Sequence, residues 1–268
     1  MKDSDLLSIS QFSELTGIKQ SVLRHYDEVE LFKPIKRDEN GYRYYSAPQT
    51  ISVNLINVMH SANIPIKTIK EFIRHREPEQ ILNLFHKQEF DLNRELLRLQ
   101  QAYSIIHTYC EVIDEGLHAD ERAISIKVME AVPIELGPEN DFSSGYMYDS
   151  FFEFLKFMDE RNISTAYPTG GVYNNFNAFV NSPGYPNRYF SHAPIGRSNK
   201  DMGEYAVGYA RGYYGQLGDL PSRMQEYVQK HDYYFTGPVY EMHLFDEVVV
   251  ENPEQYLIQV SVPVKKHK

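Results

Sequence analysis

The spacing of apolar residues in the first thirty positions predicts two short helices separated by a turn. In residues 8–16, Phe12 and Leu15 lie three apart on one face, and Gly17 ends the helix. In residues 20–29, apolar residues again recur with helical spacing. Two short helices joined by a glycine-containing turn are typical of a helix-turn-helix unit, although other helix pairs share this pattern.

The next residues, 31–45, predict a basic β-hairpin. Pro34 ends the preceding helix, and the dipeptide Asn40-Gly41 predicts a two-residue turn because both residues tolerate positive φ. Basic side chains along this segment would lie within reach of a DNA backbone; they are Lys33, Lys36, Arg37 and Arg43. Taken alone, the hairpin is equally consistent with an ordinary surface loop whose charges are solvated.

Residues 77–115 predict one long helix, because neither Gly nor Pro occurs between Glu79 and Glu115, and Gly116 ends it. Core-type residues repeat along this helix in a heptad pattern with one four-residue stutter. We call this row the seam: Ile81, Phe85, Gln88, Leu92, Leu96, Leu99, Tyr103, Ile106, Cys110 and Ile113. Either the C-terminal part of the chain or a second chain must cover it. Cys110 is predicted to be a small buried packing residue of the seam rather than a metal ligand.

Residues 120–268 predict two similar halves, each with the order strand, helix, strand, strand. In the first half the elements are a strand at 124–130, a helix at 148–161 and strand material after a Thr169-Gly170-Gly171 turn. In the second half they are a strand at 205–213, a helix at 221–231 and strands at 238–250 and 256–264. The pattern predicts an α+β fold in which a duplicated βαββ unit surrounds a shared concavity.

Charge is distributed unevenly along the 268 residues, which carry a net charge of −10. Residues 1–76, the head, have a net charge of +2, residues 77–119 of −5, and residues 120–268, the body, of −7. This arrangement suits a DNA-binding module joined to a ligand or partner domain. The single cysteine excludes an internal disulfide, and no apolar run is long enough to span a membrane. The acidic N-terminus is unlike a signal peptide, so we expect a cytoplasmic protein without membrane contact.

The head resembles the MerR family of transcriptional regulators. The motifs that carry the resemblance are Leu23-Arg24-His25-Tyr26-Asp27, Leu31-Phe32-Lys33-Pro34, Arg37 and Gly41-Tyr42-Arg43-Tyr44-Tyr45. The resemblance implies a winged helix-turn-helix, with a recognition helix at 20–29, a wing at 33–45 and a second helix pair at 48–59 and 65–76. The DNA-binding residues that it implies are Lys19, Gln20, Arg24, His25, Tyr26, Tyr42 and Arg43.

Family resemblance also implies how such a head would act. The long helix would form an antiparallel coiled coil, so that the protein is a homodimer that binds promoter DNA. The dimer would activate transcription by distorting an over-long promoter spacer for RNA polymerase. The predicted domains are therefore a DNA-binding domain at 1–76, a dimerisation helix and linker at 77–119, and a ligand-binding domain at 120–268.

The body resembles the GyrI-like effector-binding domain, which occurs in the multidrug-sensing branch of MerR regulators. The resemblance rests on Leu136-Gly137-Pro138-Glu139-Asn140, Tyr205-Ala206 and Val239-Tyr240-Glu241, followed by Met242-His243-Leu244-Phe245. Alternation along 239–245 places Glu241 and His243 on one face of a strand. A carboxylate among apolar neighbours needs a partner, and a cationic ligand is one such partner. The alternatives are a solvated Glu241 or an ion pair with Arg211 or Arg223.

The resemblance implies a pocket for a lipophilic, cationic aromatic ligand. Glu241 would face the positive charge, Tyr148 and Tyr167 would supply aromatic walls, and His243 would be neutral when a cation is bound. Gln259 takes a position where a drug-sensing relative carries a second acid, which favours a monocation or a polar neutral ligand over a dication.

The sequence contains no signature of an enzyme, a metal site or a cofactor site. It has no H-x-x-x-H pair, no G-x-S-x-G, no phosphate-binding P-loop and no paired cysteines, so we predict neither catalytic nor metal-binding residues. Some GyrI-like proteins are hydrolases that use a pocket glutamate, and Glu241 with His243 could activate water. A hydrolase or a partner-protein module attached to a DNA-binding head therefore remains the alternative.

Overall fold

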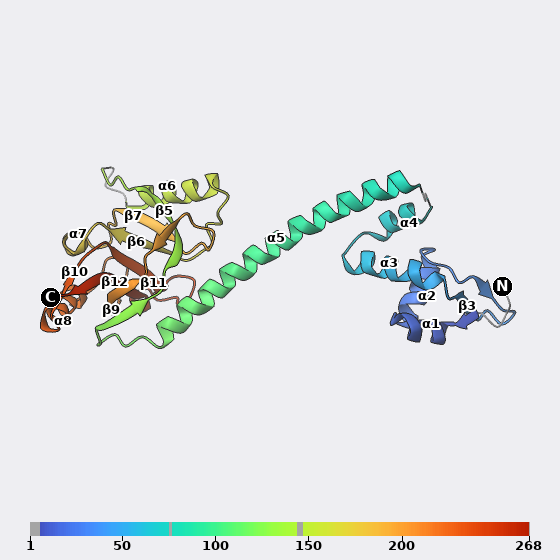
Figure 1. Ribbon diagram of the computed structural model, residues 1–268, viewed down its shortest axis with the longest axis horizontal. Helices are drawn as coiled ribbons and strands as arrows, with labels where there is room; N and C mark the ends of the chain where they lie inside the picture. Colours follow the sequence, from blue (N-terminus) through green and yellow to red (C-terminus); the bar gives the residue numbers. More distant parts are fainter. Residues whose placement is uncertain (1–5, 75–76, 144–146, 268) are drawn as a thin grey trace. The chain divides into compact units, whose positions relative to one another are not determined.

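The computed structural model describes residues 6–74, 77–143 and 147–267. The chain divides into two compact units, residues 1–99 and residues 100–268. Helix α5 (Pro78–Leu117) is continuous across the boundary between them (Figure 1). The predicted end of this helix at Gly116 is wrong, because the helix includes Gly116. A Cβ atom at this position would lie 2.4 Å from the ring of Phe245, so glycine is required there for packing.

The helices of the first unit confirm the predicted helix-turn-helix and the second helix pair. Ser8 caps the first helix in a capping box with Gln11, and Gly17 ends that helix with a φ of 71°. The helices are α1 (Ile9–Thr16), α2 (Gln20–Glu28), α3 (Gln49–Ser61) and α4 (Ile66–Arg74).

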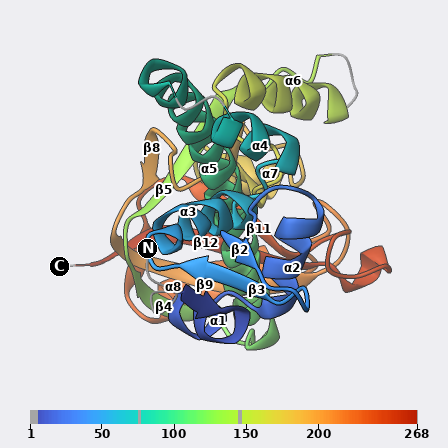
Figure 2. The ribbon, with the colours of Figure 1, turned by 90° about the vertical axis from the view of Figure 1, so that its right-hand side faces the viewer.

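The wing belongs to a small antiparallel sheet in the order β1-β3-β2, seen in Figure 2 beside α1 and α2. Its strands are β1 (Leu6–Ser8), which the sequence did not predict, β2 (Lys36–Arg37) and β3 (Arg43–Ser46). The predicted two-residue turn is wrong, because Arg37 pairs with Arg43 and the loop spans residues 38–42. Only Gly41 has positive φ in this loop, and the Asp38 carboxylate organises it by accepting the backbone N–H of Tyr42 at 2.8 Å.

An aromatic stack forms the core of the first unit. The ring of Tyr45 lies 4.5 Å from that of Phe12 and 5.8 Å from that of Phe32, measured between centroids. All three side chains are buried, so the stack fixes α1 against the wing strand and against the segment that follows α2.

The described part of the second unit forms a nine-stranded antiparallel sheet in the order β4-β9-β12-β11-β6-β7-β5-β8, with β10 paired to β12. The strands are β4 (Ser125–Met129), β5 (Val132–Glu139), β6 (Thr169–Tyr173), β7 (Arg188–Ser191), β8 (Ser198–Lys200), β9 (Gly203–Arg211), β10 (Tyr233–Phe235), β11 (Val239–Phe245) and β12 (Leu257–Lys266). The helices are α6 (Met147–Glu160), α7 (Phe176–Asn181), α8 (Leu220–Lys230) and the short η2 (Pro253–Gln255).

The strand order confirms a duplicated βαββ unit. The two copies are β5-α6-β6-β7 and β9-α8-β11-β12, and in each copy the third strand lies between the first two. The copies meet where β6 pairs with β11. The opening strand of the first copy is β5 rather than the predicted strand at 124–130, which is the added edge strand β4.

The predicted Thr169-Gly170-Gly171 turn is instead part of strand β6. A Cβ atom on Gly170 would lie 2.3 Å from the carbonyl oxygen of Glu241, so glycine is needed there for the close approach of β11.

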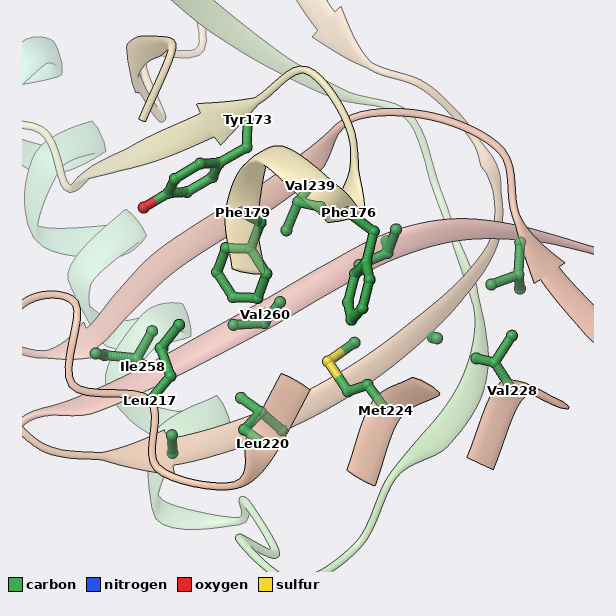
Figure 3. Packing of buried hydrophobic residues seen from close by; sticks show 14 residues of the cluster. Tyr173, Phe176, Phe179, Leu217, Leu220, Met224, Val228, Val239, Ile258 and Val260 are labelled. Carbon is green, nitrogen blue, oxygen red and sulfur yellow. The ribbon is translucent and has the colours of Figure 1, made fainter. Parts of the chain in front are cut away.

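Apolar side chains cover both faces of this sheet. On one face, Phe176 and Phe179 of α7 and Met224 of α8 pack on Val260 of β12 (Figure 3). On the other face, Val112 of α5 belongs to a cluster with residues of β9, β11 and β12. The central strands therefore lie between the two small helices and the last turns of α5.

Candidate functional site

The exposed face of α2 carries the polar side chains that the sequence assigned to DNA contact. Lys19, Arg24 and His25 are exposed, and Arg24 Nη2 donates to Gln20 Oε1 at 3.3 Å. Tyr42, in the wing loop, is 66% exposed. These positions suit contacts to a duplex, and DNA contact by each of them stays a prediction.

A buried carboxylate joins helix α2 to the wing. Asp27 of α2 accepts Arg37 Nη2 at 2.5 Å and Arg43 Nε at 2.6 Å, both at Oδ2. Only 4% of the Asp27 side chain is exposed, so the two guanidinium groups offset the cost of burying its charge. Arg43, predicted to contact DNA, therefore also fixes the wing to α2.

Tyr26 is not available as a DNA contact, which corrects the prediction for this residue. Its side chain is fully buried, and its hydroxyl lies 3.1 Å from Nδ1 of His60 on α3. Burial raises the pKa of the phenol, so Tyr26 is a neutral packing group that joins α2 to α3.

A pocket of about 250 Å³ lies over the central pair of strands in the second unit. Its floor includes Gly171 of β6, which is in register with Glu241 of β11. A Cβ atom on Gly171 would lie 2.7 Å from the Pro186 side chain, so the glycine keeps this region open. The lining residues are Tyr148, Phe151, Thr169, Gly170, Gly171, Gly184, Pro186, Tyr189, Tyr213, Tyr214, Glu241, His243, Asp246, Glu247 and Tyr256.

Glu241 is the buried carboxylate of this pocket, with a relative exposure of 3%. Its Oε2 accepts the hydroxyl of Tyr173 at 2.8 Å, and its Oε1 lies 3.2 Å from Nε2 of His243. The Tyr173 hydroxyl itself accepts the N–H of Gly184 at 3.0 Å. Burial, followed by the charge of Glu241, raises the pKa of Tyr173, so this partner is a neutral phenol.

Neither of the arginines considered as partners of Glu241 contacts it. Arg211 Nε lies 2.5 Å from Glu121, and Arg223 Nε lies 2.8 Å from Asp219. Glu241 is therefore held by polar groups rather than by an arginine, and its negative charge is directed to the pocket.

Aromatic rings from distant parts of the chain form the pocket walls. The hydroxyl groups of Tyr148 and Tyr213 lie 2.8 Å apart, and the ring of Tyr214 meets that of His243 edge-on at 4.6 Å. Burial, then the charge of Glu241, raises the pKa of Tyr189 to about 12. The hydrogen bond with Tyr148 is the main cause that raises the pKa of Tyr213 to about 12. The walls are therefore uncharged near neutral pH.

The charged groups that line the pocket are acidic. Glu241, Asp246 and Glu247 contribute carboxyl groups, and no lysine or arginine occurs among the described lining residues. Burial raises the pKa of Asp246, and the adjacent Glu247 adds to this effect. A cation is the ligand charge that this environment favours.

Two residues predicted for the pocket lie outside it. Tyr167 is buried in a separate cluster with Phe154 and Met158 of α6, because α6 packs its apolar face there. Gln259 faces the opposite side of the sheet, since Val260 is the residue in register with Glu241. The Gln259 Nε2 donates instead to Oε1 of Glu115 on α5 at 2.6 Å.

Residues 8–45 match the family described as MerR family regulatory protein. The head of the chain therefore carries a MerR-type domain. Over 96% of its length it is 26% identical to the multidrug-efflux transporter 2 regulator of Bacillus subtilis, 95% of which is covered. It is also 30% identical to the multidrug-efflux transporter 1 regulator of the same organism, over 54% of this chain and 55% of that protein.

A solved structure aligns with nearly all residues of this chain. This is the cryo-EM structure of an EcmrR–DNA complex, with 14% identity, coverage of 97% of this chain and 100% of that chain, and a TM-score of 0.41. Among residues 6–74, 77–143 and 147–267, no helix is long and apolar enough to cross a membrane. No group of three or more potential metal ligands is found in the same residues.

Sequence reasoning missed several residues of the candidate sites. Asp27 lies one position after the buried Tyr26, and its burial depends on two arginines from the wing. Asp246 and Glu247 were missed because the sequence predicted a strand over 238–250. The strand in fact ends at Phe245, and the two acids follow it. Four further tyrosines of the pocket wall could not be identified from the sequence around each of them, because they come together only in the folded sheet. They are Tyr189, Tyr213, Tyr214 and Tyr256.

Proposed function

We propose that this MerR-family regulator binds promoter DNA as a homodimer and activates transcription when a lipophilic cation occupies the pocket of the second unit. The head supplies DNA binding, and the pocket supplies the response. Two relatives with similar sequences are regulators of multidrug-efflux transporters, which supports a response to drug-like molecules in this chain as well.

The buried Glu241 carboxylate is the observation that carries the proposal. A cation that enters the pocket replaces water next to a charge that is already largely removed from water, so the attraction exceeds that at an exposed site. Tyrosine faces add a cation–π attraction of about 0.5–2 kcal/mol each. Because no lysine or arginine is found among the described lining residues, no resident side-chain ammonium or guanidinium competes with the ligand there.

Exposed apolar residues along α5 support the homodimer. Leu92, Leu96 and Leu99 of the seam are 44%, 53% and 52% exposed in the single chain. Cys110 of the seam is exposed too in the single chain, and its burial in the seam stays a prediction. A row of leucines with heptad spacing is stable in water when a second helix covers it, so we assign α5 to a coiled coil between two copies.

The mechanism that we propose for activation is promoter distortion. RNA polymerase would use a promoter whose spacer the ligand-bound dimer kinks and untwists. The ligand must therefore bind more tightly to the distorting state than to the relaxed state, because equal affinity would change nothing.

The geometry favours a sensor over a hydrolase. One oxygen of Glu241 accepts Tyr173 and the other lies 3.2 Å from His243, so both oxygens already have a polar partner, which favours a fixed counter-charge over a free general base. We therefore propose that the chain acts without catalysis.

Calorimetric titration with tetraphenylphosphonium tests the sensor function. Replacing Glu241→Gln removes the charge at nearly constant shape, and we expect affinity to fall about 30-fold or more, as for other desolvated charge pairs. Glu251→Gln is the matched control, because Glu251 is exposed and does not line the pocket. Equal affinity of the Glu241→Gln variant and the wild type would refute the proposed role of Glu241.

A further inference from the structure

We propose that the pocket selects ligands with two separated positive charges. Glu241 would bind one charge, and the adjacent pair Asp246 and Glu247, which we call the rim acids, would bind the other. This inference rests on the proposed cation-sensing function and specifies the class of ligand.

The rim acids lack a cationic partner in the described part of the chain. Asp246 Oδ1 accepts the backbone N–H of Val248 at 2.9 Å, and Glu247 Oε2 accepts the hydroxyl of Tyr214 at 2.5 Å. Neither carboxylate is within salt-bridge distance of a described lysine, arginine or histidine. Two neighbouring carboxylates that both line one cavity repel each other, and a ligand cation between or beside them would relieve that repulsion.

Two aromatic residues separate the rim acids from Glu241. His243 lies beside Glu241, with 3.2 Å between Nε2 and Oε1. The Tyr214 ring meets the His243 ring at 4.6 Å, while the Tyr214 hydroxyl holds Glu247. These contacts connect Glu241 to Glu247 by way of the His243–Tyr214 pair, and we infer that a ligand that meets both acids carries two positive charges held apart.

The wall between these anionic groups suits an apolar spacer. The rings of Tyr213 and Tyr214 lie 4.9 Å apart, and Tyr256 lies 5.6 Å from Tyr214, measured between centroids. A ligand with cationic ends and an apolar or aromatic middle would place its middle against these rings and its ends at the acids.

The position of Gln259 removes the reason to expect a monocation. That expectation depended on a neutral amide in the pocket, and Gln259 instead contacts Glu115 on the other face of the sheet. Asp246 and Glu247 add two acids that the sequence analysis did not place in the pocket.

Matched ligands test this inference. Alkanes with a trimethylammonium group at both ends are compared by calorimetry with alkanes of the same chain length that carry the group at one end. We expect the wild type to bind the best dication about tenfold or more tightly than its monocation, with an optimum spacer length, because each charge pair adds binding energy.

Variants assign the second charge to the rim acids. Asp246→Asn combined with Glu247→Gln should remove the preference for the dication, so that the ratio of the dication and monocation affinities falls to about one. Glu247→Gln alone serves if the double variant does not fold, because Glu247 is exposed at the rim. The Glu247→Gln variant should show a smaller preference for the dication than the wild type. The control variant Glu251→Gln should keep the full preference.

The outcomes separate this inference from the proposed function. If the wild type binds both ligands equally, or if the rim variants keep the preference, the dication inference is wrong. Loss of monocation binding in Glu241→Gln would still support the sensor function in that case. If no cation binds to the wild type, both proposals fail.

Discussion

At the scale of single residues, two of the buried carboxylates, Asp27 and Glu241, have opposite consequences. Asp27 is held by Arg37 and Arg43, so its charge is compensated within the fold. Glu241 is held by the phenol of Tyr173 and by His243, and no arginine or lysine contacts it among the described residues. The first carboxylate stabilises a junction, and we propose that the second leaves a charge for a ligand.

Replacing Asp27→Asn should destabilise the head. Two arginines would lose their common partner, and we expect a loss of about 1–3 kcal/mol, below the range for fully buried pairs because both arginines reach solvent. Denaturant unfolding followed by circular dichroism measures the change. Glu28→Gln, at the exposed neighbouring position, is the control and should behave as wild type.

Lys200 makes stability depend on pH. Burial lowers the pKa of its ammonium to about 8, and its Nζ donates to Ser261. Between about pH 8 and pH 10.4, the ordinary value for lysine, the unfolded chain binds more protons than the folded one, so this residue makes stability rise with pH. Below pH 8 both states are protonated, and the contribution no longer changes.

The difference in unfolding free energy between wild type and Lys200→Met isolates this contribution. From pH 8 to pH 10 the difference should shift in favour of wild type, by up to about 3 kcal/mol for a shift of this size. A difference that does not change over this range would show that Lys200 titrates normally.

At the scale of elements, the local sequence pattern predicted those structural features that depend on a single segment. Alternation along 239–245 predicted that Glu241 and His243 share a face, and the uninterrupted run after Glu79 predicted α5. The pattern within a strand does not say which face the pocket occupies. That depends on the register between β11 and β12, and this is why Gln259 was placed wrongly.

For aromatic residues, too, the sequence of one segment does not show which side chains reach the pocket. Both Tyr148 and Tyr167 were predicted as walls, but only Tyr148 lines the pocket, because an aromatic ring fits a core and a pocket equally well in sequence. Tyr189 and Tyr214 reach the pocket from β7 and from the loop after β9, which only the strand order brings together.

The seam of α5 should determine whether the protein is a dimer. Introducing Leu92→Glu and Leu99→Glu together would place like charges in the coiled coil, and light scattering should show a monomer. Leu97→Glu is the matched control, because Leu97 is exposed but lies off the seam. A dimer of unchanged affinity in the double variant would place the interface elsewhere.

At the scale of the whole molecule, the pocket and the last turns of α5 share two strands. β11 carries Glu241 on one face, and β12 carries Gln259 on the other, where it binds Glu115 of α5 at 2.6 Å. Tyr209 of β9 donates to the same Glu115 carboxylate at 3.1 Å. A change in β11 or β12 on ligand binding would therefore reach the helix that we assign to the dimer.

A single measurement tests most directly whether a cation in the pocket changes the DNA. A duplex selected from random sequences by the wild-type protein would carry a fluorescent adenine analogue at its centre, where unstacking raises the emission. Adding tetraphenylphosphonium to the bound duplex should raise the emission with wild type and not with Glu241→Gln, although both bind the duplex equally without cation. No response of the wild type at saturating cation, or an equal response of the variant, would contradict ligand sensing through Glu241.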